Sequence, residues 1–272
     1  MKGHTLADWL TLREPYDAAA RSESLVRVAA DALPRHRPLR IVDLGAGRGS
    51  NVRYLTGRLP QPQHWVLVDE DPVVLDDVPW AMAGILRPPS AIETRELSLG
   101  VLDGGLFEGC HLVTASALLD LVSESWLESL ADRCVAISAV GLFALTYNGE
   151  SQCSPVEPED EEIRKLMNCH QRTNDKGFGR AAGPDAVDVA ERCFSERGYR
   201  VQRARSDWNL SSDARELQRQ LVDGWAEAAS EIAPEFSTAI VSWHQRRRAH
   251  IDAARSQIIV CHEDLVALPP RP

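Results

Sequence analysis

The chain of 272 residues is 44% hydrophobic and 26% charged, which is enough apolar content for one large α/β domain. Its formal net charge of −10 repels a phosphate backbone at long range and disfavours a nucleic-acid substrate. No apolar run is long enough to span a bilayer, and the N-terminal residues lack the apolar stretch of a signal peptide. We therefore expect a cytoplasmic protein without a membrane contact. The 6 cysteines are scattered without a C-x-x-C pair, so we expect reduced thiols and no metal site.

The N-terminal part of the sequence predicts two helices. Apolar residues recur at helical spacing over 6–12 and 18–33, and Pro15 interrupts the pattern between them. The second helix would then lead directly into the first strand.

The most informative segment is an apolar strand that ends in a glycine-rich turn. Residues 40–44 are mostly aliphatic and predict a buried parallel strand. Gly45, Gly47 and Gly49 follow at once, and glycines allow a ligand to approach the main chain closely. Their spacing is G-x-G-x-G, whereas a dehydrogenase typically has G-x-G-x-x-G. The pattern therefore predicts a nucleotide-type site and favours a cofactor other than NAD.

With Asp43 two residues before the first glycine, the segment 42–49 (VDLGAGRG) resembles the first motif of class I S-adenosylmethionine-dependent methyltransferases. The resemblance implies a doubly wound, mostly parallel, seven-stranded Rossmann-like sheet with its last strand reversed, helices on both faces and helical insertions. It also implies an acidic residue after the second strand that binds both ribose hydroxyls, about 20 residues beyond the glycines. Asp69 stands there, at the end of the apolar run 64–69. The two motifs together make S-adenosyl-L-methionine the predicted cofactor.

The predicted cofactor site combines the glycine turn, the acidic strand end and the ends of neighbouring strands. Ser50 can cap a helix whose first turn lies beside the cofactor. The family frequently has an aspartate just past the third strand, here 92–99, and Ser98 takes that position. The fourth strand, 111–122, carries further residues at the ligand-facing edge. We predict that the cofactor contacts Asp43, Gly45, Ala46, Gly47, Gly49, Asn51, Asp69, Glu70, Ser98, Ala115 and Ser116.

Three side chains are candidates for catalysis. Asp120 lies near the carboxyl end of the fourth strand, Tyr147 ends the fifth strand at 135–147, and His170 lies beyond it. Asp120 can equally cap the next helix, and His170 can be an ordinary surface residue. A strong base is not required, because aligning an acceptor with an activated methyl group can supply most of the rate.

Two segments can enclose this site. In small-molecule methyltransferases of this type, N-terminal helices often cover the active site, which implies a cover at 1–36 over a cofactor-binding core at 37–148. Tyr16 and Arg21 then either face the ligands or pack as ordinary helix residues. Residues 149–184 are polar and proline-rich and contain the start of an acidic helix at 155–162. A long loop of this kind usually serves as a lid or binding element. Its candidate substrate contacts are His170, Gln171 and Lys176, with Gly177 and Gly179 as flexible positions.

The C-terminal half, 185–272, predicts a helix, a strand, an insertion of two helices at about 211–256, and a last strand from 257. Trp225 and Trp243 lie in these helices and favour a core role over a ligand platform. The basic run 246–248 favours solvated surface.

The resemblance implies an enzyme, in a single methyltransferase domain spanning 1–272, that transfers a methyl group to a small-molecule acceptor. The acidic chain, the inserted segments and the absence of an Asn/Asp-Pro-Pro-aromatic tetrapeptide at the fourth strand all disfavour nucleic acid. The alternatives are an RNA or protein methyltransferase, and a non-catalytic S-adenosylmethionine-binding protein. The sequence leaves the oligomeric state open between monomer and homodimer.

Overall fold

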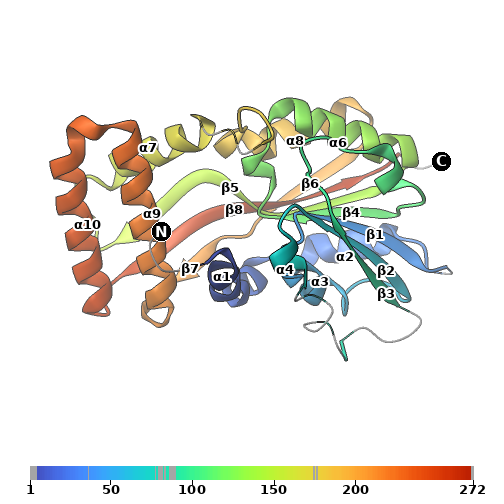
Figure 1. The fold of residues 1–272 in the computed structure, drawn as a ribbon, viewed down its shortest axis with the longest axis horizontal. Helices are drawn as coiled ribbons and strands as arrows, with labels where there is room; N and C mark the ends of the chain where they lie inside the picture. The colour runs from blue at the N-terminus through green and yellow to red at the C-terminus, as the bar shows by residue number, and fades with distance from the viewer. Residues whose placement is uncertain are drawn as a thin grey trace.

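The computed structural model describes residues 5–35, 37–76, 78, 82, 84–85, 90–173, 175 and 177–270. Its centre is a sheet in the order β3-β2-β1-β4-β5-β8-β6, with β7 paired to β8 (Figure 1). The strands are β1 Leu39–Leu44, β2 Gln63–Asp69, β3 Ala91–Glu96, β4 Leu112–Ser116, β5 Val140–Ser154, β6 Arg200–Arg205, β7 Trp208–Leu210 and β8 Gln257–Leu268. Strands β1 to β5 pair in parallel, and β8 is antiparallel to both β5 and β6. The predicted mostly parallel sheet with a reversed last strand is confirmed, and β7 is an addition to it.

Helices cover both faces of the central sheet. On one face lie α2 Glu23–Ala32 and α3 Ser50–Leu55, and on the other lie α6 Glu124–Ile137 and α8 Ala186–Glu196. Alternate residues of a strand point to opposite faces, so Ile41 packs in the core under α2 and α3 while Val42 packs under α6 and α8. Burial on both faces explains the continuous apolar runs in these strands.

An outer lobe of helices is built on the far ends of β5 and β8, which extend well beyond the central sheet (Figure 1). Its helices are α7 Asp160–Thr173, α9 Arg215–Ile232 and α10 Ser237–Asp252. Trp225 and Trp243 belong to the apolar core of this lobe, where Trp243 is almost fully buried. Among the described helices, none is long and apolar enough to cross a membrane.

Helix α1 spans Leu6–Ala20 without interruption, so the predicted break at Pro15 is wrong. A proline inside a helix removes one backbone hydrogen bond without necessarily ending the helix. The helix begins with a capping box in which Thr5 and Asp8 bond each other's backbone N–H groups. The ion pair Arg13–Asp17 at 2.8 Å then bridges the turn that contains the proline. The chain breaks instead after the helix, just before the N-cap of α2.

Residues 149–184 do not form the predicted long loop. Strand β5 continues to Ser154 because its outer half pairs with β8, and α7 then occupies Asp160–Thr173. The irregular part that follows α7 is short. Two further boundaries differ: β4 ends at Ser116, where Ala117 adopts a φ of 53°, and α6 extends to Ile137, so that β5 begins at Val140. Helix α4 spans Pro72–Asp76, and much of the chain between it and β3 lies outside the described residues.

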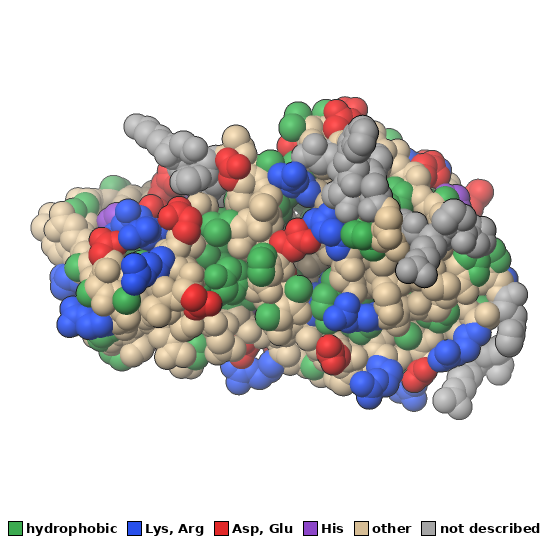
Figure 2. Space-filling view, turned by 90° about the horizontal axis from the view of Figure 1, so that it is seen from below, with side chains coloured by type: hydrophobic (Ala, Val, Ile, Leu, Met, Phe, Trp, Pro, Cys, Tyr) green, Lys and Arg blue, Asp and Glu red, His purple; other side chains and the backbone are tan. Residues whose placement is uncertain are grey.

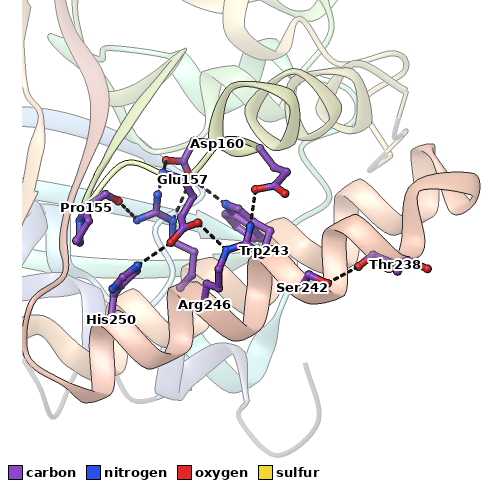
Figure 3. Close-up of polar contacts among 10 residues, drawn as sticks. Pro155, Glu157, Asp160, Thr238, Ser242, Trp243, Arg246 and His250 are labelled. Atoms are coloured by element: carbon purple, nitrogen blue, oxygen red, sulfur yellow. Dashed lines mark hydrogen bonds and ion pairs between the residues drawn. The ribbon is translucent and has the colours of Figure 1, made fainter.

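A polar network fixes α10 against the chain before α7 (Figure 3). Arg247 is fully buried, pairs with the Asp160 carboxylate and donates through Nη1 to the Pro155 carbonyl at 2.6 Å. Arg246 donates to Glu157 at 2.6 Å. The sequence predicted the basic run 246–248 on the solvated surface, and for Arg247 this prediction is wrong. Its guanidinium can be buried because the Asp160 carboxylate neutralises its charge.

Candidate functional site

A cavity of about 240 Å³ opens at the carboxyl ends of β1, β2 and β4, beneath α1. Such an edge is where open α/β sheets bind ligands. Viewed from below, hydrophobic side chains lie among acidic and basic ones across the middle of the molecule (Figure 2). The lining includes seven of the residues predicted to bind the cofactor: Gly45, Ala46, Gly47, Asn51, Asp69, Glu70 and Ser116.

The glycine turn has the backbone geometry that its sequence predicts. Gly45, Gly47 and Gly49 have φ angles of 66°, 50° and 76°, in the left-handed region that residues with a side chain rarely adopt. A Cβ atom on Gly47 would lie 3.2 Å from Leu10 of α1, so the turn is also close to its cover. Glycine at this position thus satisfies both the backbone and the packing.

Asp69 faces this turn from the end of β2. Its Oδ2 accepts a hydrogen bond from the Gly47 N–H at 2.8 Å, and its Oδ1 accepts one from the Asp71 N–H at 3.1 Å. A carboxylate has about four lone-pair sites, so about one site on each oxygen is left for a further donor. Two adjacent hydroxyl groups of a ribose would match this arrangement.

Behind the glycine turn lies a buried polar chain. Asp43 is fully buried, and its Oδ1 accepts from Asn51 Nδ2 at 2.7 Å. Asn51 also donates to Thr114 Oγ1 at 3.2 Å, while its own Oδ1 accepts from Arg21 Nη1 at 2.5 Å. Burial raises the pKa of the Asp43 carboxyl to about 7. Asn51 lines the cavity and Asp43 does not. Asp43 therefore acts by positioning Asn51.

Three other residues predicted to bind the cofactor lie beside the lining rather than in it. Gly49 precedes α3, and Ala115 is buried within β4. Ser98 is exposed and accepts a hydrogen bond from the Gly100 N–H at 3.3 Å, whereas its neighbour Leu99 lines the cavity. The turn after β3 thus offers an apolar side chain where the sequence predicted a polar one.

None of the predicted catalytic side chains lines the cavity formed by the described residues. Asp120 is buried in a short 3₁₀ turn, between Leu118 and Leu121, which do line it. The Tyr147 hydroxyl donates to Asn168 Oδ1 at 3.1 Å, and burial raises the pKa of Tyr147. His170 lies on α7 and pairs with Glu231 of α9 at 2.9 Å. The roles proposed for these residues stay predictions.

Helix α1 supplies lining residues that the sequence did not single out: Leu6, Leu10, Arg13, Glu14 and Asp17. Their spacing places them on one face of a continuous helix, a signal that the assumed break at Pro15 concealed. Glu14 accepts two hydrogen bonds of 2.6 Å from Arg53 of α3, and Asp17 accepts one of 3.0 Å from Trp208 Nε1 on β7. These contacts hold α1 over the cavity.

A short loop around Phe178 closes another side of the cavity. Phe178 lines it and packs edge-on against Trp126, with ring centroids 6.2 Å apart. The loop also lies close to the turn after β3, since a Cβ atom on Gly100 would come within 2.9 Å of the Gly177 carbonyl oxygen. Among the described residues of the lid predicted over 149–184, only Phe178 lines the cavity, and Lys176 is not among those residues.

Each of the two acidic side chains of α1 that line the cavity forms an ion pair with an arginine. Asp17 pairs with Arg13, and Glu14 pairs with Arg53. Burial raises the pKa of Asp17, while its bonds to Arg13 and to Trp208 oppose that shift. Within the part of the chain that the structure describes, no group of three His, Cys, Asp or Glu side chains could hold a metal ion.

No protein-family model and no curated protein matches the sequence significantly. Among solved structures, the chain is similar to the cyclopropane synthase MmaA2 from Mycobacterium tuberculosis, with 12% identity over 90% of this chain and 83% of that one and a TM-score of 0.49. It is similar to the YcgJ protein from Bacillus subtilis, with 12% identity over 92% and 100% and a TM-score of 0.49. It is also similar to a geranyl diphosphate C-methyltransferase from Streptomyces coelicolor A3(2), with 12% identity over 90% and 79% and a TM-score of 0.45. Identities this low say nothing about substrate, so the chemistry rests on the cavity itself.

Proposed function

We propose that this protein is an S-adenosylmethionine-dependent methyltransferase that acts on a small-molecule acceptor. The observation that carries the proposal is the pairing of the glycine turn with Asp69 at the edge of the cavity. The Gly47 N–H fixes the Asp69 carboxylate and leaves acceptor sites for a ribose diol. The G-x-G-x-G spacing favours this cofactor over NAD.

The residues of the cavity suit an adenosyl cofactor. Val74 and Leu99 offer apolar surface for a base near the ends of β2 and β3, and Glu70 lies beside them. The glycine turn and Ser116 line the neighbouring part, where a methionine chain would extend. When bound, the cofactor supplies an electrophilic methyl group on a sulfonium.

This chain would contribute mainly by orienting the two reactants and excluding water. Glu14 and Asp17 are held in ion pairs with Arg53 and Arg13, so their carboxylates are already bound to donors of this chain. An acceptor that is already nucleophilic would need only alignment with the methyl group, and alignment can supply several kcal/mol of the barrier. Leu10, Leu118 and Phe178 would shield the reacting atoms from water.

A small acceptor suits the enclosure of the cavity by α1 and by the loop around Phe178. The formal net charge of −10 works against a nucleic-acid acceptor. One observation favours a second candidate, a protein that binds the cofactor without transferring its methyl group: no predicted catalytic side chain lines the described cavity, and its acids on α1 are ion-paired.

Parallel calorimetric titrations with S-adenosylmethionine, S-adenosylhomocysteine and NAD test the proposal. We expect the first two compounds to bind and NAD not to bind. Binding of NAD alone would refute our interpretation of the glycine turn. Incubation with methyl-labelled cofactor and a panel of small metabolites then separates the two candidates, because only a methyltransferase transfers the label.

A further inference from the structure

Next to the cavity lies a second, polar chamber of about 250 Å³. The two spaces share a wall formed by Glu14, Asp17, Ser50, Asn51 and Ser116. The two spaces are therefore adjacent. The charged side chains that line the chamber are three arginines and two acids: Arg21, Arg53, Arg58, Glu14 and Asp17.

Arg21 differs from Arg53 of this chamber and from Arg13 of the neighbouring cavity. Arg13 and Arg53 each hold a carboxylate through Nε and Nη2, on Asp17 and Glu14 respectively. Arg21 is 6% exposed, yet its Nε and Nη2 have no hydrogen-bond partner among the described residues. They form the same edge of the guanidinium, which is the geometry that binds a carboxylate with two parallel bonds.

The guanidinium of Arg21 is held in place from two sides. Its Nη1 donates to Asn51 Oδ1 at 2.5 Å, and its carbon atom Cζ lies 4.3 Å from the centre of the Tyr54 ring. Both contacts leave the edge formed by Nε and Nη2 without a partner in the described chain. A donor pair that is already oriented loses little conformational freedom when it binds a ligand.

The charges around the chamber favour a single negative charge. Glu14 and Asp17 are each neutralised by an arginine, whereas Arg21 has no ion pair within 4.0 Å among the described residues. Asp43 is linked to Arg21 only through Asn51, and its elevated pKa weakens its compensation of Arg21 near neutral pH. The buried Asp264 also acts on the charge of Arg21, but its two carboxylate oxygens accept hydrogen bonds from the Ser22 and Leu145 N–H groups. A buried guanidinium edge without a hydrogen-bond partner is costly, and a bound anion would remove that cost.

We propose that Arg21 binds a carboxylate group through Nε and Nη2 in the chamber beside the cofactor cavity. The inference rests on the proposed function, and it adds a site to it. The carboxylate belongs either to the methionine part of the cofactor or to the methyl acceptor, because both would lie next to the wall that contains Asn51 and Ser116. The chemistry at Arg21 is the same in both cases.

Calorimetry on the full chain distinguishes the two sources. The ligands are S-adenosylhomocysteine, 5′-methylthioadenosine, which lacks the amino-acid part, and benzoate added to the protein saturated with S-adenosylhomocysteine. If the cofactor carboxylate is bound, Arg21→Ala should weaken S-adenosylhomocysteine about 10- to 100-fold and leave 5′-methylthioadenosine unchanged. If the acceptor carboxylate is bound, the same variant should leave S-adenosylhomocysteine unchanged and abolish benzoate binding.

Two further variants make the test specific. Arg21→Lys keeps the charge but not the paired donors, so it should recover only part of the loss, and it carries the test if Arg21→Ala does not fold. Arg58→Ala is the control, because Arg58 stacks on the same Tyr54 ring, at 4.0 Å, and lines the same chamber. Its effect should be smaller than that of either Arg21 variant.

The proposal is overturned if both Arg21 variants bind S-adenosylhomocysteine as the wild type does and show no benzoate binding that depends on Arg21. Equal losses in Arg21→Ala and Arg58→Ala would also overturn it, because they would indicate general charge alone. A wild-type chain that binds neither adenosyl compound would instead refute the proposed function. Normal wild-type binding with unaffected Arg21 variants would refute only the site at Arg21.

Discussion

Replacing Asp69 with alanine should remove the proposed contacts to the ribose. The Asp69 carboxylate already accepts one backbone hydrogen bond on each oxygen, from Gly47 and from Asp71. One acceptor site per oxygen is then left for the two ribose hydroxyls. A hydrogen bond to a charged group contributes about 1.5–3 kcal/mol net of competing water, and Asp69 is only half-buried, so water can replace part of what is lost. We expect Asp69→Ala to weaken S-adenosylhomocysteine by about 1–3 kcal/mol in total, which is roughly 5- to 150-fold.

The substitution also frees the Gly47 and Asp71 N–H groups, so part of any loss would come from the turn itself. Titrating wild type and Asp69→Ala with both S-adenosylhomocysteine and its 2′,3′-dideoxy analogue separates the two contributions, because the analogue lacks the hydroxyls. The difference between the two losses reports the ribose contacts alone. Asp76→Ala, an exposed acid on α4, is the control for the removed charge.

The reasoning would be refuted by either of two results. An unchanged affinity for S-adenosylhomocysteine would mean that Asp69 does not contact the cofactor. The same loss with the dideoxy analogue would mean that Asp69 acts only by holding the glycine turn.

Three other changes test separate parts of the site. Gly47→Ala should lower the free energy of unfolding by about 1–2 kcal/mol in denaturant titrations, because Gly47 has a positive φ. Gly57→Ala is the control and should not lower it, because the space around Gly57 is open. Equal effects of the two substitutions would contradict this reasoning. The pKa of Asp43 rises from 3.8 to about 7 on folding, so the stability that its proton provides is lost as the pH rises through that range. Asp43→Asn mimics the protonated acid, and its free energy of unfolding should therefore increase relative to wild type by on the order of 2 kcal/mol between pH 5 and pH 8. Parallel pH profiles of the two proteins would show that Asp43 stays charged. Phe178→Ala should speed the dissociation of S-adenosylhomocysteine roughly 5- to 30-fold in stopped-flow experiments, because Phe178 lines the cavity. The control is Phe236→Ala, since Phe236 is exposed. An unchanged dissociation rate in Phe178→Ala would show that the loop does not retain the ligand.

The parts of the fold that the sequence predicted are those fixed by local pattern. The apolar runs at β1 and β2 are buried on both faces, so each is recognisable without its neighbours. The glycine turn follows from backbone constraints that only glycine meets easily. The long outer half of β5 was missed because its polar residues gain their strand conformation by pairing with β8, more than a hundred residues later.

The candidate site was predictable where residues follow a strand end and not where distant segments meet. Gly47, Asn51 and Asp69 belong to the first group. The contribution of α1 was hidden by the rule that proline ends a helix, and tertiary contacts such as Glu14–Arg53 override that rule here. Phe178 reaches the cavity through packing on Trp126, which no local pattern indicates.

The two longest strands of the sheet have a consequence for cooperativity. Strands β5 and β8 pair from Gly141 and Ala267 in the central sheet to Ser154 and Gln257 in the outer lobe. The same two segments of backbone therefore belong to both apolar cores. Melting of the outer helices would expose strand edges that continue into the central sheet, where β8 lies between β5 and β6. The two lobes should consequently unfold as one cooperative unit. A destabilising substitution near α10 would therefore also lower the stability of the region around the cofactor cavity.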